Sequence, residues 1–230
     1  MSKTASDDDW LKARLSLLAD EKAFQVARDK LAARRRALPW RRLSQNYEFD
    51  GESGLLTLDD MFGDCSQLMI YHFMFHPDWD EGCKSCSFWA DSYDGVVSHL
   101  RARDVSLAAV SRAPLEKLTA YRERMGWSFP WYSAANTTFN QDFNVSFTKD
   151  EIDSGNATYN YRETKRIGEE MPGLSVFRRD GGTIYHTYST YSRGLDPFNT
   201  AYQLLDLTPK GRDEDDFDFT MSWLRRHDEY

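Results

Sequence analysis

The sequence predicts an α/β protein in which helices flank a mixed sheet, and three features of the 230-residue chain support this fold class. Two apolar runs, at 67–75 and 105–110, have the length and composition of strands that are buried on both faces. A segment of helical periodicity follows each run, which is the alternation expected of parallel strands joined by right-handed crossovers. A β-hairpin later in the chain adds antiparallel strands, so the predicted sheet is mixed.

The first predicted element is a long helix over residues 9–37. Trp10, Leu17, Phe24 and Leu31 recur at seven-residue spacing and place an apolar stripe along this helix. Acidic residues begin the helix and basic residues end it, as the helix dipole favours. A lone amphipathic helix must pack on another surface, so we expect the stripe to cover the chain's own domain or to join two copies in a homodimer.

The remaining elements follow from the same patterns, punctuated by glycine and proline. The first half is expected to contain a connecting arm at 46–63, a strand at 67–75, a helix at 83–101, a strand at 105–110, a helix at 115–125 and an extended segment at 128–133. The second half is expected to contain a polar surface insertion at 149–172, a hairpin of strands 174–179 and 183–190, a proline-started segment at 197–206 and a last helix near 216–228. This is the order of a thioredoxin-like core, in a peroxiredoxin-like arrangement.

We expect these elements to form one unit with three parts. Residues 1–45 are the N-terminal helical arm, and residues 46–195 are the thioredoxin-like core with its insertion near 149–172. Residues 196–230 are predicted to be a C-terminal helical extension of the same unit.

Composition excludes several functional classes. Hydrophobic residues make up 40% of the chain and aromatic residues 14%, which is typical of a folded globular protein. A net charge of −8 gives no support to nucleic-acid binding, which needs a basic surface. The polar N-terminus has no signal-peptide core, and no run approaches the roughly 20 apolar residues of a membrane span. We therefore expect a cytoplasmic protein with neither a nucleic-acid nor a membrane partner.

The stretch "HPDWDEGCKSCSFWA" carries the strongest chemical signal. Cys83 and Cys86 lie two residues apart where the first buried strand gives way to a helix. At a helix start, the unpaired N–H groups and the helix dipole favour a thiolate, so we predict that Cys83 attacks a disulfide and that Cys86 resolves the mixed disulfide. This chemistry needs no cofactor or metal, and its expected substrate is a protein or small-molecule disulfide.

Neighbouring charged residues would shift the pKa of the Cys83 thiol in opposite directions. Lys84 adds positive charge, whereas the acidic residues Asp78, Asp80 and Glu81 would raise the pKa of the Cys83 thiol if they pointed inward. The sequence does not decide which effect is larger, so it leaves open whether the pair reduces, oxidises or isomerises disulfides.

Three residues are candidates for contact with the substrate. Met171 and Pro172 precede a late strand, where thioredoxin-like enzymes place a cis-proline beside the disulfide. A plain turn proline would fit the same position. Trp79 flanks the cysteines and would shield them or simply pack against the core.

Two alternatives from other classes stay open. His72 and His76 precede the cysteines, and together with Cys83 and Cys86 they could supply four zinc ligands. Alternatively, the fold could serve as a non-catalytic binding module with inert cysteines. The third cysteine, Cys65, is expected to be a small semi-buried thiol in the turn before the first strand.

Peroxide reduction is a neighbouring enzymatic idea. The peroxidase signature places a proline seven residues, and a threonine or serine three residues, before the reactive cysteine. Here those positions hold His76 and Asp80, and Pro77 is displaced by one residue. A peroxide pocket is therefore not predicted.

Longer phrases carry a more specific signal than any of these motifs. The phrases "GCKSCSFWAD", "RMGWSFPWYSA", "FNQDFNVSF" and "HTYSTYSRGLD" resemble a bacterial family of unknown function whose members are described as predicted dithiol–disulfide oxidoreductases with a thioredoxin-like fold. The resemblance runs from about Trp10 to Tyr230. It implies that the terminal segments belong to one unit with the core, and that the family's "GC-x-x-CS" corresponds to Cys83 and Cys86.

Overall fold

A computed structural model describes residues 4–165 and 167–230; residues 1–3 of the predicted arm and Arg166 of the predicted insertion lie outside the described residues. The chain divides into two compact units, Met1–Pro39 and Trp40–Tyr230.

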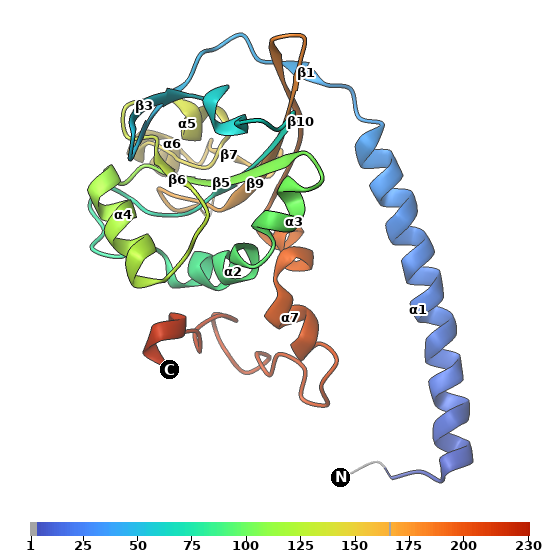
Figure 1. Ribbon diagram of the computed structural model, residues 1–230. Helices are drawn as coiled ribbons and strands as arrows, with labels where there is room; N and C mark the ends of the chain where they lie inside the picture. The colour runs from blue at the N-terminus through green and yellow to red at the C-terminus, as the bar shows by residue number, and fades with distance from the viewer. Residues whose placement is uncertain (1–3, 166) are drawn as a thin grey trace. The chain divides into compact units, whose positions relative to one another are not determined.

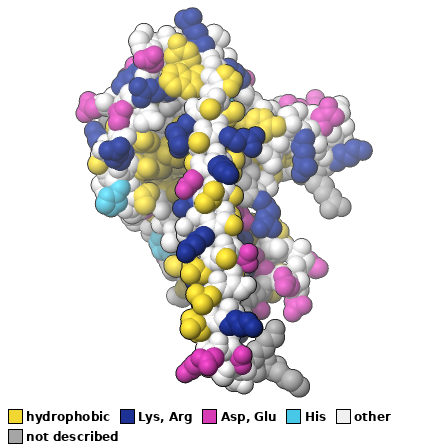
Figure 2. All heavy atoms as spheres, turned by 90° about the vertical axis from the view of Figure 1, so that its right-hand side faces the viewer, with side chains coloured by type: hydrophobic (Ala, Val, Ile, Leu, Met, Phe, Trp, Pro, Cys, Tyr) yellow, Lys and Arg dark blue, Asp and Glu magenta, His cyan; other side chains and the backbone are white. Residues whose placement is uncertain are grey.

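The described part of the first unit is essentially one helix, α1 (Asp7–Arg36), as the seven-residue spacing predicts. The Ser6 side chain caps it by accepting a hydrogen bond from the Asp9 backbone N–H at 3.2 Å. Acidic residues occupy its first turn and basic residues its last. Taken by itself the helix buries no side chain, and Figure 2 shows hydrophobic side chains distributed along its length.

The second unit is built on an eight-stranded mixed sheet of order β1-β10-β9-β4-β5-β6-β2-β3 (Figure 1). Its strands are β1 Arg41–Arg42, β2 Glu48–Gly51, β3 Gly54–Thr57, β4 Gln67–His72, β5 Val105–Ser111, β6 Trp131–Ser133, β9 Gly173–Asp180 and β10 Thr183–Tyr191. β4, β5 and β6 are parallel, and β9 runs antiparallel to both β4 and β10. The central order β10-β9-β4-β5, with β9 reversed, is that of the thioredoxin-like core, so the predicted fold class is confirmed.

Helices connect these strands. The bounds are α2 Lys84–Asp94, α3 Val97–Arg101, α4 Leu115–Arg124, α5 Phe139–Asp142, α6 Lys149–Ser154 and α7 Thr200–Leu205, with 3-10 turns η1 Asp60–Phe62, η2 Ser192–Phe198 and η3 His227–Glu229. A small separate hairpin pairs β7 Thr158–Tyr159 with β8 Arg162–Glu163. Both crossovers between parallel strands contain helices, α2 and α3 between β4 and β5, and α4 between β5 and β6.

The side chains of β4 divide the interior into two clusters because alternate residues of a strand point to opposite faces. Tyr71 packs with Trp89 of α2 in one cluster. Leu68 and Ile70 pack with Phe139 of α5 in the other. The strand is buried on both sides, which explains its almost unbroken apolar sequence.

Three expected segments differ from the structure. The connecting arm at 46–63 contains the β2–β3 hairpin, which pairs with the sheet at its edge through β6. The helix expected over 83–101 is two helices that part at Gly95, a residue that costs backbone entropy inside a helix. The insertion at 149–172 is not wholly on the surface, since Tyr159 and Glu170 are buried.

The last helix expected near 216–228 is wrong. That segment consists of turns and the short η3 element. Aspartates, which are poor helix formers, crowd its beginning. Its side chains also have tertiary partners, because Trp223 donates to Glu214 and Arg226 donates to the Gly82 carbonyl. These contacts fix an irregular path that local propensity does not reveal.

Among the described residues, no helix combines the length and apolar character that crossing a membrane requires.

Candidate active site

The two cysteines lie at the start of α2, just beyond the carboxyl end of β4. Cys83 is the N-cap residue and Cys86 lies in the first helical turn. The backbone N–H of Cys83 donates to the Met74 carbonyl at 3.1 Å, which ties the helix start to the segment that leaves the strand. The carboxyl edge of a sheet is where α/β proteins place their sites.

Cys83 is half-buried and is the more acidic of the two thiols. A hydrogen bond from the Cys86 thiol is the largest influence that lowers its pKa, to about 6, and the N–H groups of Cys86 and Ser85 act in the same direction. Burial opposes them and is outweighed. The unpaired N–H groups of a helix start favour a negative charge, so the position of Cys83 adds to the effect of the Cys86 thiol.

Cys86 is buried and has the opposite character. Burial raises its pKa well above the usual value, and the neighbouring Cys83 thiolate raises it further. Its sulfur accepts a hydrogen bond from the Met74 backbone N–H at 3.4 Å. The pKa of Cys83 is therefore shifted downward and that of Cys86 upward, which favours ionisation of Cys83 before Cys86.

The acidic loop does not determine the charge of Cys83. Glu81 forms ion pairs with Arg124 at 2.5 Å and with Arg226 at 2.9 Å. Asp78 and Asp80 are exposed to solvent. The competition that the sequence leaves open is thus resolved at the helix start, where the groups of the first turn dominate.

A hydrogen-bonded chain supports the turn behind Cys83. The Ser87 hydroxyl donates to the Cys83 carbonyl at 3.0 Å and lies 2.8 Å from the hydroxyl of Tyr121. Arg226, from the C-terminal segment, donates to the Tyr121 oxygen at 2.7 Å and to the Gly82 carbonyl at 3.0 Å. Figure 1 shows this segment, coloured red, near α2. The C-terminal segment therefore holds Gly82, the residue before Cys83, in place by a hydrogen bond.

Gly82 is required at its position by close packing. A Cβ built there would lie 2.8 Å from the ring of Tyr121 and 2.9 Å from that of Phe73. Any larger residue would push the turn away from both rings and displace Cys83.

A cavity of about 510 Å³ opens beside the cysteines. Met74, Trp89 and Leu195 are among its apolar lining residues, and the indole N–H of Trp89 donates to the Leu195 carbonyl at 2.9 Å. Its polar lining residues are Lys84, Ser85, Ser192, Arg193 and Asp196. Phe219 and Met221, from the C-terminal segment, contribute to the lining. The lining is predominantly apolar, so the sulfur atoms adjoin a hydrophobic recess.

The structure places two of the three predicted contact residues at this cavity. Met171 and Pro172 line it, and the bond between them is trans. Their segment is fixed by Tyr159, whose hydroxyl donates to the Pro172 carbonyl at 2.7 Å. Trp79 is not among the described side chains that line the cavity; it packs at the edge of the core.

A buried ion pair fixes the same segment from behind. Glu170 accepts hydrogen bonds from Arg112 and from the Ser146 hydroxyl, both at 2.6 Å. Burial raises the pKa of Glu170 against the opposing influence of these two partners. Arg112 follows β5 directly, so the carboxyl ends of two neighbouring strands position both walls of the cavity.

The four residues of the zinc alternative are not brought together. The imidazole of His72 points to the α5 side of the sheet, where it stacks on Phe139 and lies 2.8 Å from the Ser175 hydroxyl. The cysteines belong to the opposite cluster. Within residues 4–165 and 167–230, no group of three or more His, Cys, Asp or Glu side chains is placed to hold a metal ion. Cys65 is buried, more completely than expected.

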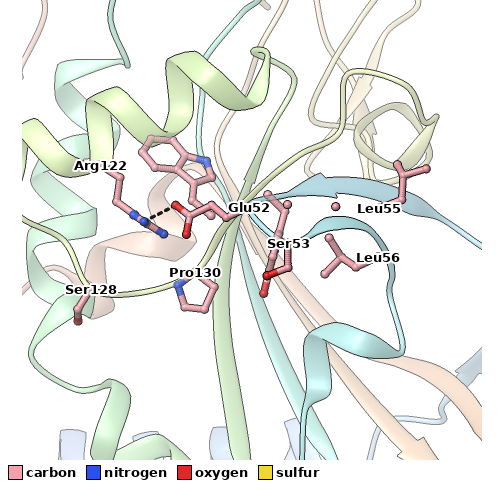
Figure 3. Close-up of a pocket in the computed structure, with 11 residues that line it drawn as sticks. Glu52, Ser53, Leu55, Leu56, Arg122, Ser128 and Pro130 are labelled. Atoms are coloured by element: carbon pink, nitrogen blue, oxygen red, sulfur yellow. Dashed lines mark hydrogen bonds and ion pairs between the residues drawn. The ribbon is translucent and has the colours of Figure 1, made fainter.

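A second hollow, of about 330 Å³, lies between the β2–β3 hairpin and the chain around Pro130 (Figure 3). Its two charged side chains, Glu52 and Arg122, point toward one another and pair at 2.5 Å. No described cysteine or histidine lines it. It therefore offers no nucleophile comparable with Cys83.

Sequence reasoning found the cysteines and the Met171–Pro172 segment but missed the residues that surround them. Tyr121, Tyr159 and Arg226 lie far from the motif in sequence, and Arg226 is 144 residues from its partner Gly82. The missed residues carry no motif of their own. Their only shared signal is the aromatic or cationic type that buried hydrogen bonds to backbone carbonyls favour.

Comparisons with solved structures return peroxiredoxins at low sequence identity. Peroxidoxin BcpB from Mycobacterium tuberculosis is 12% identical with a TM-score of 0.49, over 73% of this chain and 97% of that chain. A mutant of PrxQ from Xylella fastidiosa is 13% identical with a TM-score of 0.45, over 72% and 95%. A yeast mitochondrial 1-Cys peroxiredoxin is 16% identical with a TM-score of 0.45, over 67% and 68%. The comparison with curated proteins gave no match.

The family comparison covers the whole chain. Residues 1–230 match the family described as "Bacterial protein of unknown function (DUF899)". The chain therefore belongs to this family.

Proposed function

We propose that this member of the DUF899 family is a thiol–disulfide oxidoreductase, with Cys83 as the nucleophile and Cys86 as the resolving thiol. The observation that carries the proposal is the placement of the two thiols: Cys83 is half-buried at the N-cap of α2, Cys86 is buried in the first turn, and both line one cavity. The pKa of Cys83 is lowered to about 6, whereas that of Cys86 is raised. Inert structural cysteines have no need of this contrast, and perturbed titratable groups gather at functional sites.

The first step is attack by the thiolate. The lowered pKa of Cys83 favours its thiolate, which is the nucleophilic form. The Cys83 sulfur attacks one sulfur of the substrate, the substrate S–S bond breaks, and the second sulfur leaves as a thiolate. The product is a mixed disulfide between Cys83 and half of the substrate.

The second step depends on the loss of negative charge at Cys83 in the first step. Once Cys83 is in a mixed disulfide, its negative charge no longer raises the pKa of Cys86. Cys86 then loses its proton more readily and attacks the Cys83 sulfur, which releases the second substrate thiolate. The two electrons gained by the substrate come from the protein dithiol, which ends as a Cys83–Cys86 disulfide.

The same contrast indicates the redox poise of the pair. A stabilised thiolate stabilises the reduced form, and this raises the reduction potential. We therefore expect a more oxidising couple than thioredoxin, whose potential is about −270 mV. A dithiol reductant would return the oxidised protein to its active form.

The test is to trap the intermediate. Reduced Cys86→Ser protein is mixed with excess bis(2-hydroxyethyl) disulfide, and intact and peptide mass spectrometry locate the adduct. We expect one adduct, at Cys83, in Cys86→Ser, an internal disulfide in the wild type, and neither in Cys83→Ser. An adduct confined to Cys65, or no adduct, would contradict the proposal.

A further inference from the structure

The cavity beside the cysteines has the size of a small-molecule site. Its volume of about 510 Å³ lies within the roughly 300–1,000 Å³ of pockets that enclose small ligands. Cys83 is half-buried at this recess, and it does not stand on a flat exposed surface. A partner that reaches its sulfur must enter the recess.

The lining determines which chemistry is favoured there. Met74, Trp89 and Leu195 offer apolar surface beside the sulfurs, and the one polar group of Trp89 is already hydrogen-bonded within the protein. The hydroxyl of Tyr159 is likewise used by the Pro172 carbonyl. The polar lining residues are Lys84, Ser85, Ser192, Arg193 and Asp196, and Arg193 and Asp196 pair with each other at 3.1 Å. An apolar ligand arm placed against the apolar side chains would gain from burial.

The C-terminal segment completes the recess. Phe219 and Met221 line the cavity, and the segment is anchored on both sides of them. Before them, Glu214 accepts hydrogen bonds from the Tyr202 hydroxyl at 2.9 Å and from the Trp223 indole at 2.6 Å. After them, Arg226 donates to the Gly82 carbonyl at 3.0 Å. Phe219 itself is 55% exposed, so it stands at the mouth of the cavity and presents apolar surface to an entering molecule.

We propose, on the basis of the proposed function, that the substrate is a small apolar organic disulfide and that Phe219 and Met221 determine this specificity. One apolar arm of the substrate occupies the cavity while Cys83 attacks the adjoining sulfur. The reaction forms the Cys83–substrate disulfide and releases the other arm as a thiolate. Cys86 then releases the first arm, and a dithiol reductant reduces the Cys83–Cys86 disulfide.

The experiment compares disulfides that differ only in apolar length. Stopped-flow measurements follow the oxidation of reduced full-length protein, in single turnover, by diethyl, dipropyl and dibutyl disulfide and by the hydrophilic bis(2-hydroxyethyl) disulfide. The three dialkyl disulfides release thiols of similar pKa, so chain length is the main variable among them. The bis(2-hydroxyethyl) disulfide is used only in ratios compared between protein variants. We expect the second-order rate constant to rise by about fourfold for each buried methylene.

Two variants test whether Phe219 and Met221 determine the preference for apolar disulfides. In Phe219→Ala/Met221→Ala we expect the ratio of the dibutyl to the bis(2-hydroxyethyl) rate constant to fall at least fivefold. Leu207→Ala is the matched control, since Leu207 is an exposed apolar residue of the C-terminal region that does not line the cavity. This control should keep the wild-type ratio.

The outcomes separate the inference from the function on which it rests. Rate constants that do not rise with chain length, or faster oxidation by the protein disulfides of insulin, would overturn the apolar-substrate proposal alone. An unchanged ratio in the double variant would remove Phe219 and Met221 from it. Failure of Cys83 to react with any of the disulfides would instead refute the oxidoreductase function.

Discussion

At the scale of the residue, the hydrogen bond between the two thiols is the largest influence that lowers the pKa of Cys83. Cys86→Ser keeps a donor at this position and Cys86→Ala removes it. We predict an apparent pKa near 6 for alkylation of Cys83 in Cys86→Ser, and a value shifted upward by at least one unit in Cys86→Ala. In both proteins the rate must fall as the pH drops below the pKa, because the thiolate is the nucleophile.

The measurement is the rate of iodoacetamide alkylation between pH 4 and 10, with Cys65 replaced by alanine so that one thiol reports. Equal profiles in the two variants would show that the helix start alone sets the pKa.

Arg226 acts on Cys83 through the turn that it holds. Its guanidinium donates hydrogen bonds to the Gly82 carbonyl and to the Tyr121 hydroxyl oxygen. Both bonds are lost when the guanidinium is removed. We predict that Arg226→Ala raises the apparent pKa of Cys83 and lowers the free energy of unfolding by about 1–3 kcal/mol, with partial recovery in Arg226→Lys.

The matched control is Arg225→Ala, because Arg225 is the exposed neighbour. Urea unfolding and the alkylation profile are measured on all four proteins. A loss of stability without a change in the Cys83 profile would mean that Arg226 stabilises the fold but does not position the nucleophile.

At the scale of the element, β4, β9 and β10 share a buried polar chain on the side away from the cysteines. His72 lies 2.8 Å from Ser175, Ser175 lies 2.7 Å from Ser189, and Ser189 lies 2.7 Å from His186. Burial lowers the pKa of His72 to about 3 and that of His186 to about 4. Both imidazoles are therefore neutral in the folded protein at pH 5.

Unfolding takes up protons at these histidines once the pH is below their ordinary pKa of 6.5. Stability is thus complete above pH 6.5 and is lost as the pH falls toward 3, with a slope for His72 of up to about 1.4 kcal/mol per pH unit. We predict a smaller loss between pH 7 and pH 5 in His72→Gln, measured by urea unfolding. His99 is exposed, so His99→Gln is the control and should lose as much stability as the wild type. An equal loss of stability in His72→Gln, His99→Gln and the wild type would contradict the role of His72.

Some of these elements could be predicted from the sequence and others could not. The strands at 67–72 and 105–111 are marked by long apolar runs, and the hairpin at 173–191 by its Asp-Gly-Gly turn. The β2–β3 hairpin was missed because its strands are four residues each and each has a glycine at the end next to the turn. The cysteine pair is a local motif and could be found. The cavity around it could not, because its walls come from segments that only the tertiary fold brings together.

At the scale of the whole molecule, the first unit by itself leaves the apolar stripe of α1 without a packing partner. Its 30 residues expose Trp10 at 61% and Phe24 at 69%, and its charge runs from acidic at the start to basic at the end. We predict a homodimer in which the α1 helices of two copies pair antiparallel, because this arrangement puts each acidic end beside a basic one.

Light scattering after size exclusion tests this on the full chain. Leu17→Glu/Phe24→Glu should reduce the measured mass from that of two copies to that of one, while Ala19→Glu, away from the heptad stripe, should leave it unchanged. A monomeric wild type across micromolar concentrations would contradict the pairing.

The most direct test of the whole account is a redox titration of the wild-type protein. The protein is equilibrated in glutathione buffers of graded potential, its free thiols are blocked, and peptides are quantified by mass spectrometry. We predict a reversible two-electron transition between the dithiol and a Cys83–Cys86 disulfide, with a midpoint above the roughly −270 mV of thioredoxin. If Cys83 and Cys86 stay reduced throughout, or if only Cys65 is modified, the cysteines are not a redox couple and the account is wrong.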